Sequence, residues 1–264
     1  MPVIAGRPAA DEPVPAAVVA WAAGRPLLPV WRNELGGLTF RVRPDHFIKW
    51  TPLGSGIDLG SEIRRLRWAA AFTPVPPVIE QGADADGSWF VSSALPGESA
   101  VADRWLADPE RAARAIGHGL RALHDRLPVD GCPFSWSVHE RLTQVFSRAG
   151  HGNLSPDGWD EGHRQLTVAD ALERLADPPP VDRLVVCHGD ACAPNTLIDS
   201  AGEWCAHVDF GALGVADRWA DLAVATWSTQ WNYGPGWEGV LLDAYGVEPD
   251  PERTAYYRLL WDLG

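Results

Sequence analysis

Cysteines and long apolar runs are scarce in this sequence. Its four cysteines include no CxxC pair, and Cys187 lies in an apolar run, which favours reduced thiols. A zinc site built from Cys187, His188, Cys192 and Cys205 fails on ligand spacing. No apolar run approaches the roughly 20 residues that a membrane helix needs, and the N-terminus does not resemble a signal peptide. These absences predict a cytoplasmic protein without a membrane partner.

Positive charge is also scarce. The net charge of -13 argues against nucleic acid or an anionic membrane surface as the main partner. Lys49 is a single lysine among the 22 lysines and arginines. It either persists by chance or sits where a guanidinium cannot replace a compact ammonium. The 264 residues, 46% of them apolar, are enough for one large or two modest domains with real cores.

A pattern of polar residues after apolar runs indicates the chemistry. His188-Gly189-Asp190 follows the run Leu184–Cys187, and Asn195 comes five residues after Asp190. A later run ends in Asp209-Phe210-Gly211. Protein kinases carry an H-R-D-x-x-x-x-N catalytic loop followed by D-F-G, with the same spacing from aspartate to asparagine. The sequence therefore predicts an ATP-dependent kinase of a small molecule.

Hydrophobic periodicity predicts an α+β fold with two lobes. We interpret residues 1–94 as an N-terminal lobe (a nucleotide-binding antiparallel sheet with one helix), residues 95–98 as a hinge, and residues 99–264 as a larger, mainly helical lobe with the catalytic loop and the substrate pocket. Residues 1–15 are expected to form a loose leader. Strands are predicted at 27–31, 38–43, 45–50, 75–79, 88–93, 184–187, 196–198 and 206–208. Helices are predicted at 16–23, from Ser61 as the capping residue, and at 110–127, 138–148, 168–175, 216–226, 237–244 and 251–260.

Several motifs together resemble the aminoglycoside phosphotransferases, which share the two-lobed fold of protein kinases. The resemblance is carried by the two motifs above, by Gly214–Ala223 (GVADRWADLA) and by Tyr257–Leu260, and it is dense from about residue 118 onward. His124 with Cys132-Pro133-Phe134 also fits. The resemblance implies an antibiotic O-phosphotransferase that confers resistance, uses ATP and Mg²⁺, and acts as a monomer or a homodimer. The choice between ATP and GTP stays open.

The resemblance also implies catalytic roles. Asp190 is the expected base, accepting the proton of a substrate hydroxyl or orienting that hydroxyl. Asn195 and Asp209 are expected to hold Mg²⁺, because hard oxygen ligands suit this ion. Asp221 is expected to have a structural role. The side chain of Asp217 could face either the active site or the core.

On the nucleotide side, Lys49 matches the lysine with which kinases pair the α- and β-phosphates. Glu62 begins the following helix and is expected to hold that lysine. Phe47 lies two residues before Lys49 and so faces the same side of the strand, where it stacks on adenine or packs in the core. Gly36 and Gly37 are expected to cover the phosphates. The backbone of Ser93 and Leu95 is expected to receive the adenine edge.

The substrate side departs from the family. Family members present acids from three places, and Asp157, Asp160, Asp262 and the Gly264 carboxylate match two of them. The middle segment instead carries Trp227 and Trp231, two of 14 tryptophans. These rings either line the pocket or pack the core. A pocket lining would suit a less cationic substrate, such as a capuramycin-type nucleoside antibiotic. Two alternatives remain: a metabolic small-molecule kinase, and a catalytically silent kinase-like binding module.

Overall fold

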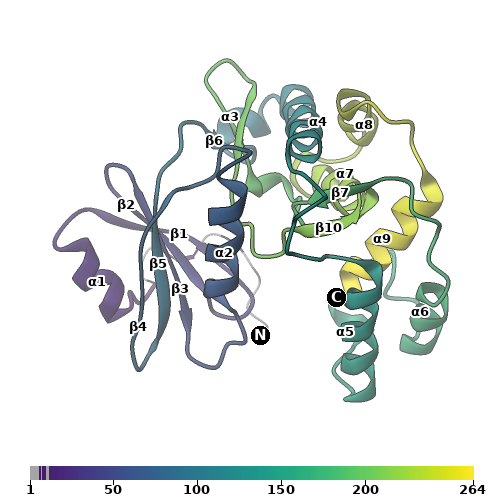
Figure 1. Cartoon of the computed structure of the whole chain (residues 1–264), viewed down its shortest axis with the longest axis horizontal. Helices are drawn as coiled ribbons and strands as arrows, with labels where there is room; N and C mark the ends of the chain where they lie inside the picture. The colour runs from purple at the N-terminus through teal and green to yellow at the C-terminus, as the bar shows by residue number, and fades with distance from the viewer. Residues whose placement is uncertain (1–5, 7, 10–11) are drawn as a thin grey trace. The chain divides into compact units, whose positions relative to one another are not determined.

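The computed structural model describes residues 6, 8–9 and 12–264 of the chain, so part of the predicted leader lies outside the described residues. The chain divides into two compact units, one ending at Pro96 and one running from Gly97 to Gly264 (Figure 1). The second unit begins with the short strand β6 (Glu98–Ser99).

The N-terminal unit is built on a five-stranded antiparallel sheet in the order β1-β2-β3-β5-β4. Its elements are α1 (Ala16–Ala22), β1 (Leu27–Arg32), β2 (Leu38–Val42), β3 (His46–Pro52), α2 (Leu59–Ala69), β4 (Val78–Ala83) and β5 (Gly87–Ser93). β3 is the central strand, so its side chains are supported by a neighbouring strand on each edge.

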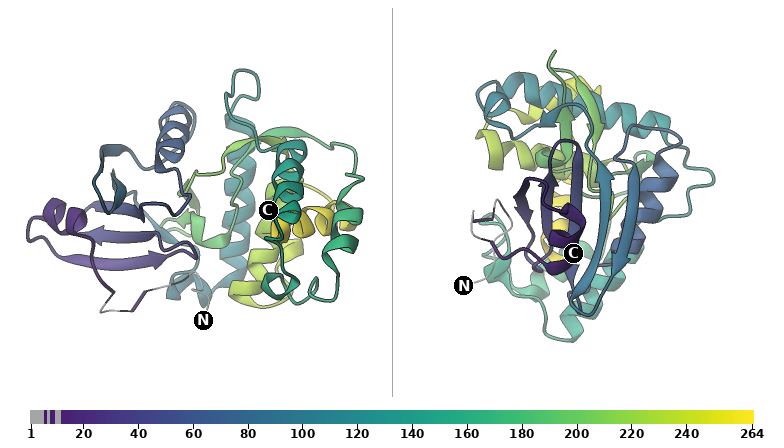
Figure 2. Two further views of the ribbon diagram at one scale, coloured as in Figure 1. Left: turned by 90° about the horizontal axis from the view of Figure 1, so that it is seen from below. Right: turned by 90° about the vertical axis from the view of Figure 1, so that its left-hand side faces the viewer.

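Side-chain alternation gives this sheet two different faces. Phe40, Ile48 and Val91 pack in one buried cluster with Val18 and Ala22 of α1. Figures 1 and 2 show α1 beside this sheet, with α2 on the other side in Figure 1. Because successive residues of a strand point to opposite faces, Phe47 and Lys49 point away from the α1 cluster. Both are half-buried.

The C-terminal unit is mainly helical, with two small sheets. Its helices are α3 (Asp103–Leu106), α4 (Pro109–Arg126), α5 (Val138–Gly150), α6 (Val168–Leu175), α7 (Trp219–Tyr233), α8 (Glu238–Tyr245) and α9 (Pro251–Leu263), with short 3₁₀ turns η1 (Pro156–Gly158) and η2 (Ala193–Asn195). Its strands after β6 are β7 (Leu184–Cys187), β8 (Thr196–Ile198), β9 (Trp204–His207) and β10 (Gly214–Asp217), paired as β10-β7 and β6-β8-β9.

Helix α7 forms the centre of this unit. All residues from Trp219 to Thr229 are buried, so the helix is surrounded on every side rather than amphipathic. Helix α4 packs closely on α8, because a Cβ atom at Gly117 would lie 2.4 Å from the carbonyl oxygen of Leu241. The glycine permits this approach of two backbones.

The predicted fold class is confirmed: an antiparallel N-terminal sheet is followed by a mainly helical region. Three local predictions were wrong. The strand predicted at 75–79 begins at Val78 instead, since prolines at 76 and 77 cannot donate to a sheet. Helix α2 is capped by Asp58, whose side chain accepts the amide of Ser61, and not by Ser61. The helix predicted from residue 216 begins at Trp219 and runs on to Tyr233. Residues 214–217 form β10 instead.

Among the described residues, no helix is both long and apolar enough to cross a membrane.

Candidate active site

The segment after β7 is held in a sharp turn by its glycine. Gly189 has a φ of 82°, and a Cβ atom at this position would lie 2.2 Å from the carbonyl oxygen of Ala212. Any other residue would be strained twice, by its φ angle and by this contact. The turn moves Asp190 out of the buried strand, and Asp190 itself is half-buried.

His188 ties this turn to the segment after β9. Its Nδ1 accepts the backbone N–H of Asp190 at 3.2 Å, and its Nε2 lies 2.9 Å from the carbonyl oxygen of Val208. A carbonyl only accepts, so Nε2 carries the proton and donates. The ring also packs against the buried Phe210, with centroids 4.8 Å apart. His188 therefore supports the loop.

Asp190, Asn195 and Asp209 gather at this turn. Asn195 Nδ2 donates to Asp190 Oδ2 at 3.0 Å and to the Asp190 carbonyl at 2.9 Å. Asp190 Oδ1 is buried and has no hydrogen-bond partner in the described part of the chain. Burial raises the pKa of Asp190, and the nearby charge of Asp209 raises it further. One oxygen of the predicted base is thus held in place, while the other is buried without a hydrogen-bond partner among the described residues.

The residue types around Asp190 also suit a divalent cation. Because Asn195 turns its Nδ2 toward Asp190, its carboxamide oxygen faces elsewhere and can act as a ligand. Asp209 has a φ of 65°, one of two non-glycine residues with positive φ among those described. Such a conformation costs free energy and tends to persist at functional sites. A carboxylate and a carboxamide oxygen are ligands that fit Mg²⁺.

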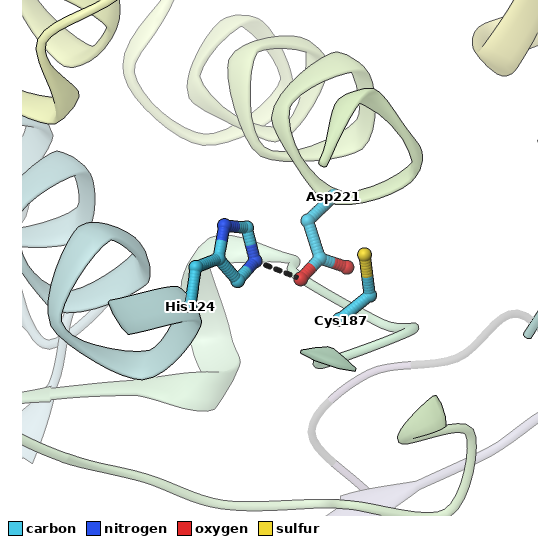
Figure 3. A group of neighbouring side chains, drawn as sticks. All are labelled: His124, Cys187 and Asp221. Carbon is cyan, nitrogen blue, oxygen red and sulfur yellow. Dashed lines mark hydrogen bonds and ion pairs between the residues drawn. The ribbon is translucent and has the colours of Figure 1, made fainter. Parts of the chain in front are cut away.

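A buried cluster lies behind the turn, formed by His124, Cys187 and Asp221 (Figure 3). Both carboxylate oxygens of Asp221 are engaged. Oδ2 accepts the N–H of His188 at 2.6 Å and lies 2.9 Å from His124 Nε2, while Oδ1 accepts the N–H of Gly189 at 2.9 Å. On the other side of the imidazole, His124 Nδ1 lies 2.8 Å from the Tyr245 hydroxyl.

This cluster is an anchor rather than a metal site. Burial alone raises the pKa of Asp221, but the hydrogen bonds that Asp221 accepts from His124 and Gly189 outweigh burial and lower the pKa. Burial raises the pKa of the Cys187 thiol well above its usual value, so this sulfur stays protonated. With Asp221 bonded to two loop amides and Cys187 neutral, the cluster offers no free anionic ligand. These contacts of Asp221 with His188, Gly189 and His124 fit the structural role expected for it.

In the N-terminal unit, Lys49 and Glu62 are brought together. Lys49 Nζ lies 2.8 Å from Glu62 Oε2, and Glu62 is almost fully buried. Phe47 lies on the same face of β3, with the Arg41 guanidinium carbon 5.8 Å from its ring centre. Removing two charges from water is costly unless they pair, so burial favours this ion pair over separate positions for the two groups.

The glycine turn between β1 and β2 is built around Asn33, which the sequence analysis did not single out. Its Oδ1 accepts the N–H groups of Leu35 at 3.1 Å and Gly37 at 2.7 Å, and Gly36 has a φ of 81°. This is the side-chain turn that asparagine commonly forms.

At the end of β5, the N–H of Ser93 already donates to the Pro77 carbonyl at 3.0 Å. An adenine contact at Ser93 would therefore need its carbonyl. Leu95 is half-buried in the segment that follows.

The residues predicted to bind substrate fall partly into one cluster. The Asp262 carboxylate accepts the Asp160 N–H at 3.1 Å and bonds to His163. The His163 ring lies edge-on to Trp227, with centroids 5.6 Å apart, and Trp227 contacts Trp231 at 5.0 Å. Trp227 is 6% exposed and Trp231 is 47% exposed. One tryptophan therefore packs inside and the other faces solvent.

The other two predicted substrate residues lie at the edges of this region. Asp157 is exposed on η1. The Gly264 carbonyl accepts a hydrogen bond from Arg148. The cluster also contains residues that the sequence analysis missed: Arg258, with its guanidinium carbon 5.5 Å from the Trp227 ring centre, and Glu238, which lies 3.2 Å from Arg258 Nη2.

The model of the phosphotransferase enzyme family matches residues 47–257, a range that contains Lys49, the catalytic turn and the buried anchor. The chain belongs to this family. An aminoglycoside 3'-phosphotransferase of Streptomyces fradiae is 35% identical over 79% of this chain and 81% of its own length. The streptomycin 3''-kinase of Streptomyces griseus is 31% identical over 94% and 96%.

Solved structures of family members agree with this assignment. An aminoglycoside 3'-phosphotransferase of type VIII matches with a TM-score of 0.78 and 31% identity, covering 91% of this chain and 94% of its own. An aminoglycoside phosphotransferase of Streptomyces rimosus in complex with ADP and streptomycin matches with a TM-score of 0.71 and 27% identity, covering 86% and 90%. The predicted family, kinase-like fold and phosphotransferase activity are confirmed.

Proposed function

We propose that this phosphotransferase transfers the γ-phosphate of ATP to a sugar hydroxyl of an aminoglycoside antibiotic and so confers resistance. The observation that carries the proposal is the state of the Asp190 carboxylate. Oδ2 is held by Asn195, and the buried Oδ1 has no partner in the described part of the chain. A substrate hydroxyl that donates to Oδ1 would satisfy this oxygen and be oriented for transfer.

Asp190 acts as the base in this proposal. A carboxylate with a raised pKa accepts a proton more readily, and general bases work best when their pKa approaches the operating pH. Asn195 and Asp209 would hold Mg²⁺, which neutralises charge on the phosphates when it is bound. Anchoring by His188 and Asp221 keeps the loop fixed during the reaction, because transfer depends mainly on positioning.

Lys49 would pair the α- and β-phosphates of the nucleotide. Its ammonium is oriented by Glu62 at 2.8 Å, and the Lys49 side chain is about one fifth exposed. Phe47 would contact the adenine ring, and the Gly36–Gly37 turn would lie over the phosphates. Adenine would be received by the Ser93 carbonyl and the backbone of Leu95.

The cluster around Trp231 is the proposed substrate wall. Asp157, Asp160 and Asp262 supply negative charge, with the Gly264 carboxylate as a further acid, and Trp231 offers an exposed ring face. Part of the acidity is compensated, because Asp262 is bonded to His163 and Glu238 is paired with Arg258. Such a wall favours substrates with ring faces and few ammonium groups.

A second candidate acceptor follows from this wall. The exposed Trp231 and the compensated acids also suit a nucleoside antibiotic of the capuramycin type, which carries a sugar and a base but little positive charge. The chemistry at Asp190 would be the same.

One assay separates these possibilities. Purified protein is incubated with ATP and MgCl₂ and, in separate reactions, with streptomycin, an aminoglycoside bearing a free 3'-hydroxyl, and a capuramycin-type nucleoside. Antibiotic-dependent ADP release and a product heavier by one phosphoryl group are expected with at least one aminoglycoside. Phosphorylation of the nucleoside alone would favour the second candidate.

Binding provides the control for this assay. A thermal-shift measurement with ATP and MgCl₂ reports nucleotide binding independently of turnover. Stabilisation by ATP without product on any antibiotic would contradict the proposed function and leave a metabolic kinase or a binding module.

A further inference from the structure

Helix α7 contacts the catalytic turn at two places, not one. Asp221 binds the amides of His188 and Gly189, before Asp190. Seven residues later, the Ser228 Oγ accepts the N–H of Ala193 at 2.8 Å, after Asp190. Seven residues are about two turns of an α-helix, so the two side chains point in nearly the same direction. The two contacts enclose Asp190 between them.

The second contact is fully buried. Ser228 and Ala193 are both 0% exposed. A backbone amide that loses its partner in such a place is left without any hydrogen bond and away from water, so the contact constrains the loop strongly. Asn232, one turn further along α7, donates through Nδ2 to the Ser228 carbonyl at 2.8 Å and to Ser228 Oγ at 3.2 Å.

We propose that Ser228 is a positioning residue for phosphoryl transfer, which holds the Ala193 side of the catalytic turn so that Asp190 Oδ1 stays directed at the substrate hydroxyl. This inference rests on the proposed function for the role of Asp190. Ser228 does not touch the reacting atoms. Its effect is on the geometry of the loop, where small displacements lower the rate much more than they lower binding.

The chain offers a matched control at the next residue. Thr229 is also 0% exposed, and among the described residues its hydroxyl donates to the Thr226 carbonyl of its own helix, at 2.7 Å. Ser228→Ala and Thr229→Val each remove one buried hydroxyl from α7. If Ser228 served only the stability of the fold, both variants would have a lower melting temperature and the same kcat.

Two measurements test the proposal. In Ser228→Ala, kcat is expected to fall at least about tenfold while KM for ATP changes less than about threefold, and Thr229→Val is expected to keep kcat within about twofold. Amide hydrogen exchange at Ala193 is expected to accelerate in Ser228→Ala and to stay unchanged in Thr229→Val. Equal kcat values in the two variants, or unchanged exchange at Ala193, would overturn the role of Ser228.

Two further points keep the outcome decisive. If Ser228→Ala does not fold, Ser228→Cys retains a side chain of similar shape with a much weaker acceptor, and the same loss of kcat and the same faster exchange are expected. If the unmodified enzyme shows no antibiotic-dependent ADP release, the proposed function fails. The exchange measurement still reports whether Ser228 fixes the loop.

Discussion

The two units hold their functional side chains in different ways. In the N-terminal unit, Lys49 lies on a central strand and forms an ion pair with Glu62. In the C-terminal unit, Asp190 lies in a turn whose backbone is bonded by His188, Asp221 and Ser228. A sheet supplies rigidity through neighbouring strands, and the strands paired on each edge of β3 fix the backbone that carries Lys49. A turn has no such support, and each of its amides needs its own acceptor.

The largest expected effect lies on the turn. Asp190→Asn keeps the size of the side chain but removes the proton acceptor, and kcat is expected to fall about 10³-fold. ADP release in steady state measures it, with nucleotide binding followed by thermal shift and expected to persist.

Asp199→Asn is the matched control for this variant, because Asp199 is likewise an aspartate in a turn of the same unit, and its carboxylate accepts the N–H groups of Ala201 and Glu203. It is expected to keep full activity. If Asp190→Asn retained a kcat near that of Asp199→Asn, Asp190 would not be the base.

The sheet side is expected to show a smaller effect of another kind. Lys49→Ala removes the ammonium that would contact phosphate, and kcat/KM for ATP is expected to fall about 10²-fold with KM for the antibiotic little changed. Arg64→Ala removes a cation from the exposed ion pair with Asp58 on α2 and should be silent. A rise confined to the antibiotic KM would place Lys49 outside the nucleotide site.

The substrate wall should respond more weakly again. Trp231→Ala removes an exposed ring, so the antibiotic KM is expected to rise about five- to tenfold while kcat and the melting temperature change little. Trp31→Ala, an exposed tryptophan of the N-terminal unit, is the control. An unchanged antibiotic KM in Trp231→Ala would remove this ring from the substrate wall.

The smallest expected effect is on the pH dependence of stability, and it arises from the buried His207 of the C-terminal unit. Burial lowers the pKa of His207 well below its usual value. Below about pH 6.5 the His207 ring therefore binds a proton in the unfolded chain but stays neutral in the folded chain. The free energy of unfolding consequently falls as the pH drops below that value. Between pH 7.5 and 5.5 the free energy of unfolding should lose about 1 kcal/mol from this residue.

Urea unfolding of His207→Asn measures this term. Asparagine can still accept the Trp204 Nε1–H, which lies 3.1 Å from His207 Nδ1, but it does not titrate. Its loss of stability over the same pH range should be smaller than that of the unmodified protein. His151→Asn, at an exposed histidine, should leave the pH dependence unaltered.

Sequence predicted the parts of the site that depend on short spacing. The aspartate, asparagine and second aspartate of the two motifs lie within twenty residues of one another, and the structure gathers them at one turn. Lys49 and Glu62 could be paired because strand β3 and helix α2 are adjacent in the chain. In each case the expectation came from the match to kinase motifs, which are short enough to be recognised along the chain.

Contacts between distant segments were not accessible in the same way. β10 forms because Gly214–Asp217 pairs with β7, and the Val215 amide bonds to the Phe134 carbonyl. The four residues of β10 carry no local pattern that predicts pairing with β7 or with Phe134. The same holds for Tyr245 and Ser228, since a tyrosine or a serine in a helix carries no local sign that its hydroxyl will meet His124 or the amide of Ala193.

Helix α7 has a consequence for how the drug spectrum of such an enzyme can evolve. Trp231 faces solvent on the same helix that carries Asp221 and Ser228 inward. Selection for a new antibiotic can exchange the outward position without disturbing turnover. A change at Asp221 or Ser228, which bond the catalytic turn, would relax that turn and is expected to lower activity toward every drug. Gain of new substrates should therefore accumulate at positions such as 231 and be nearly absent at 221 and 228.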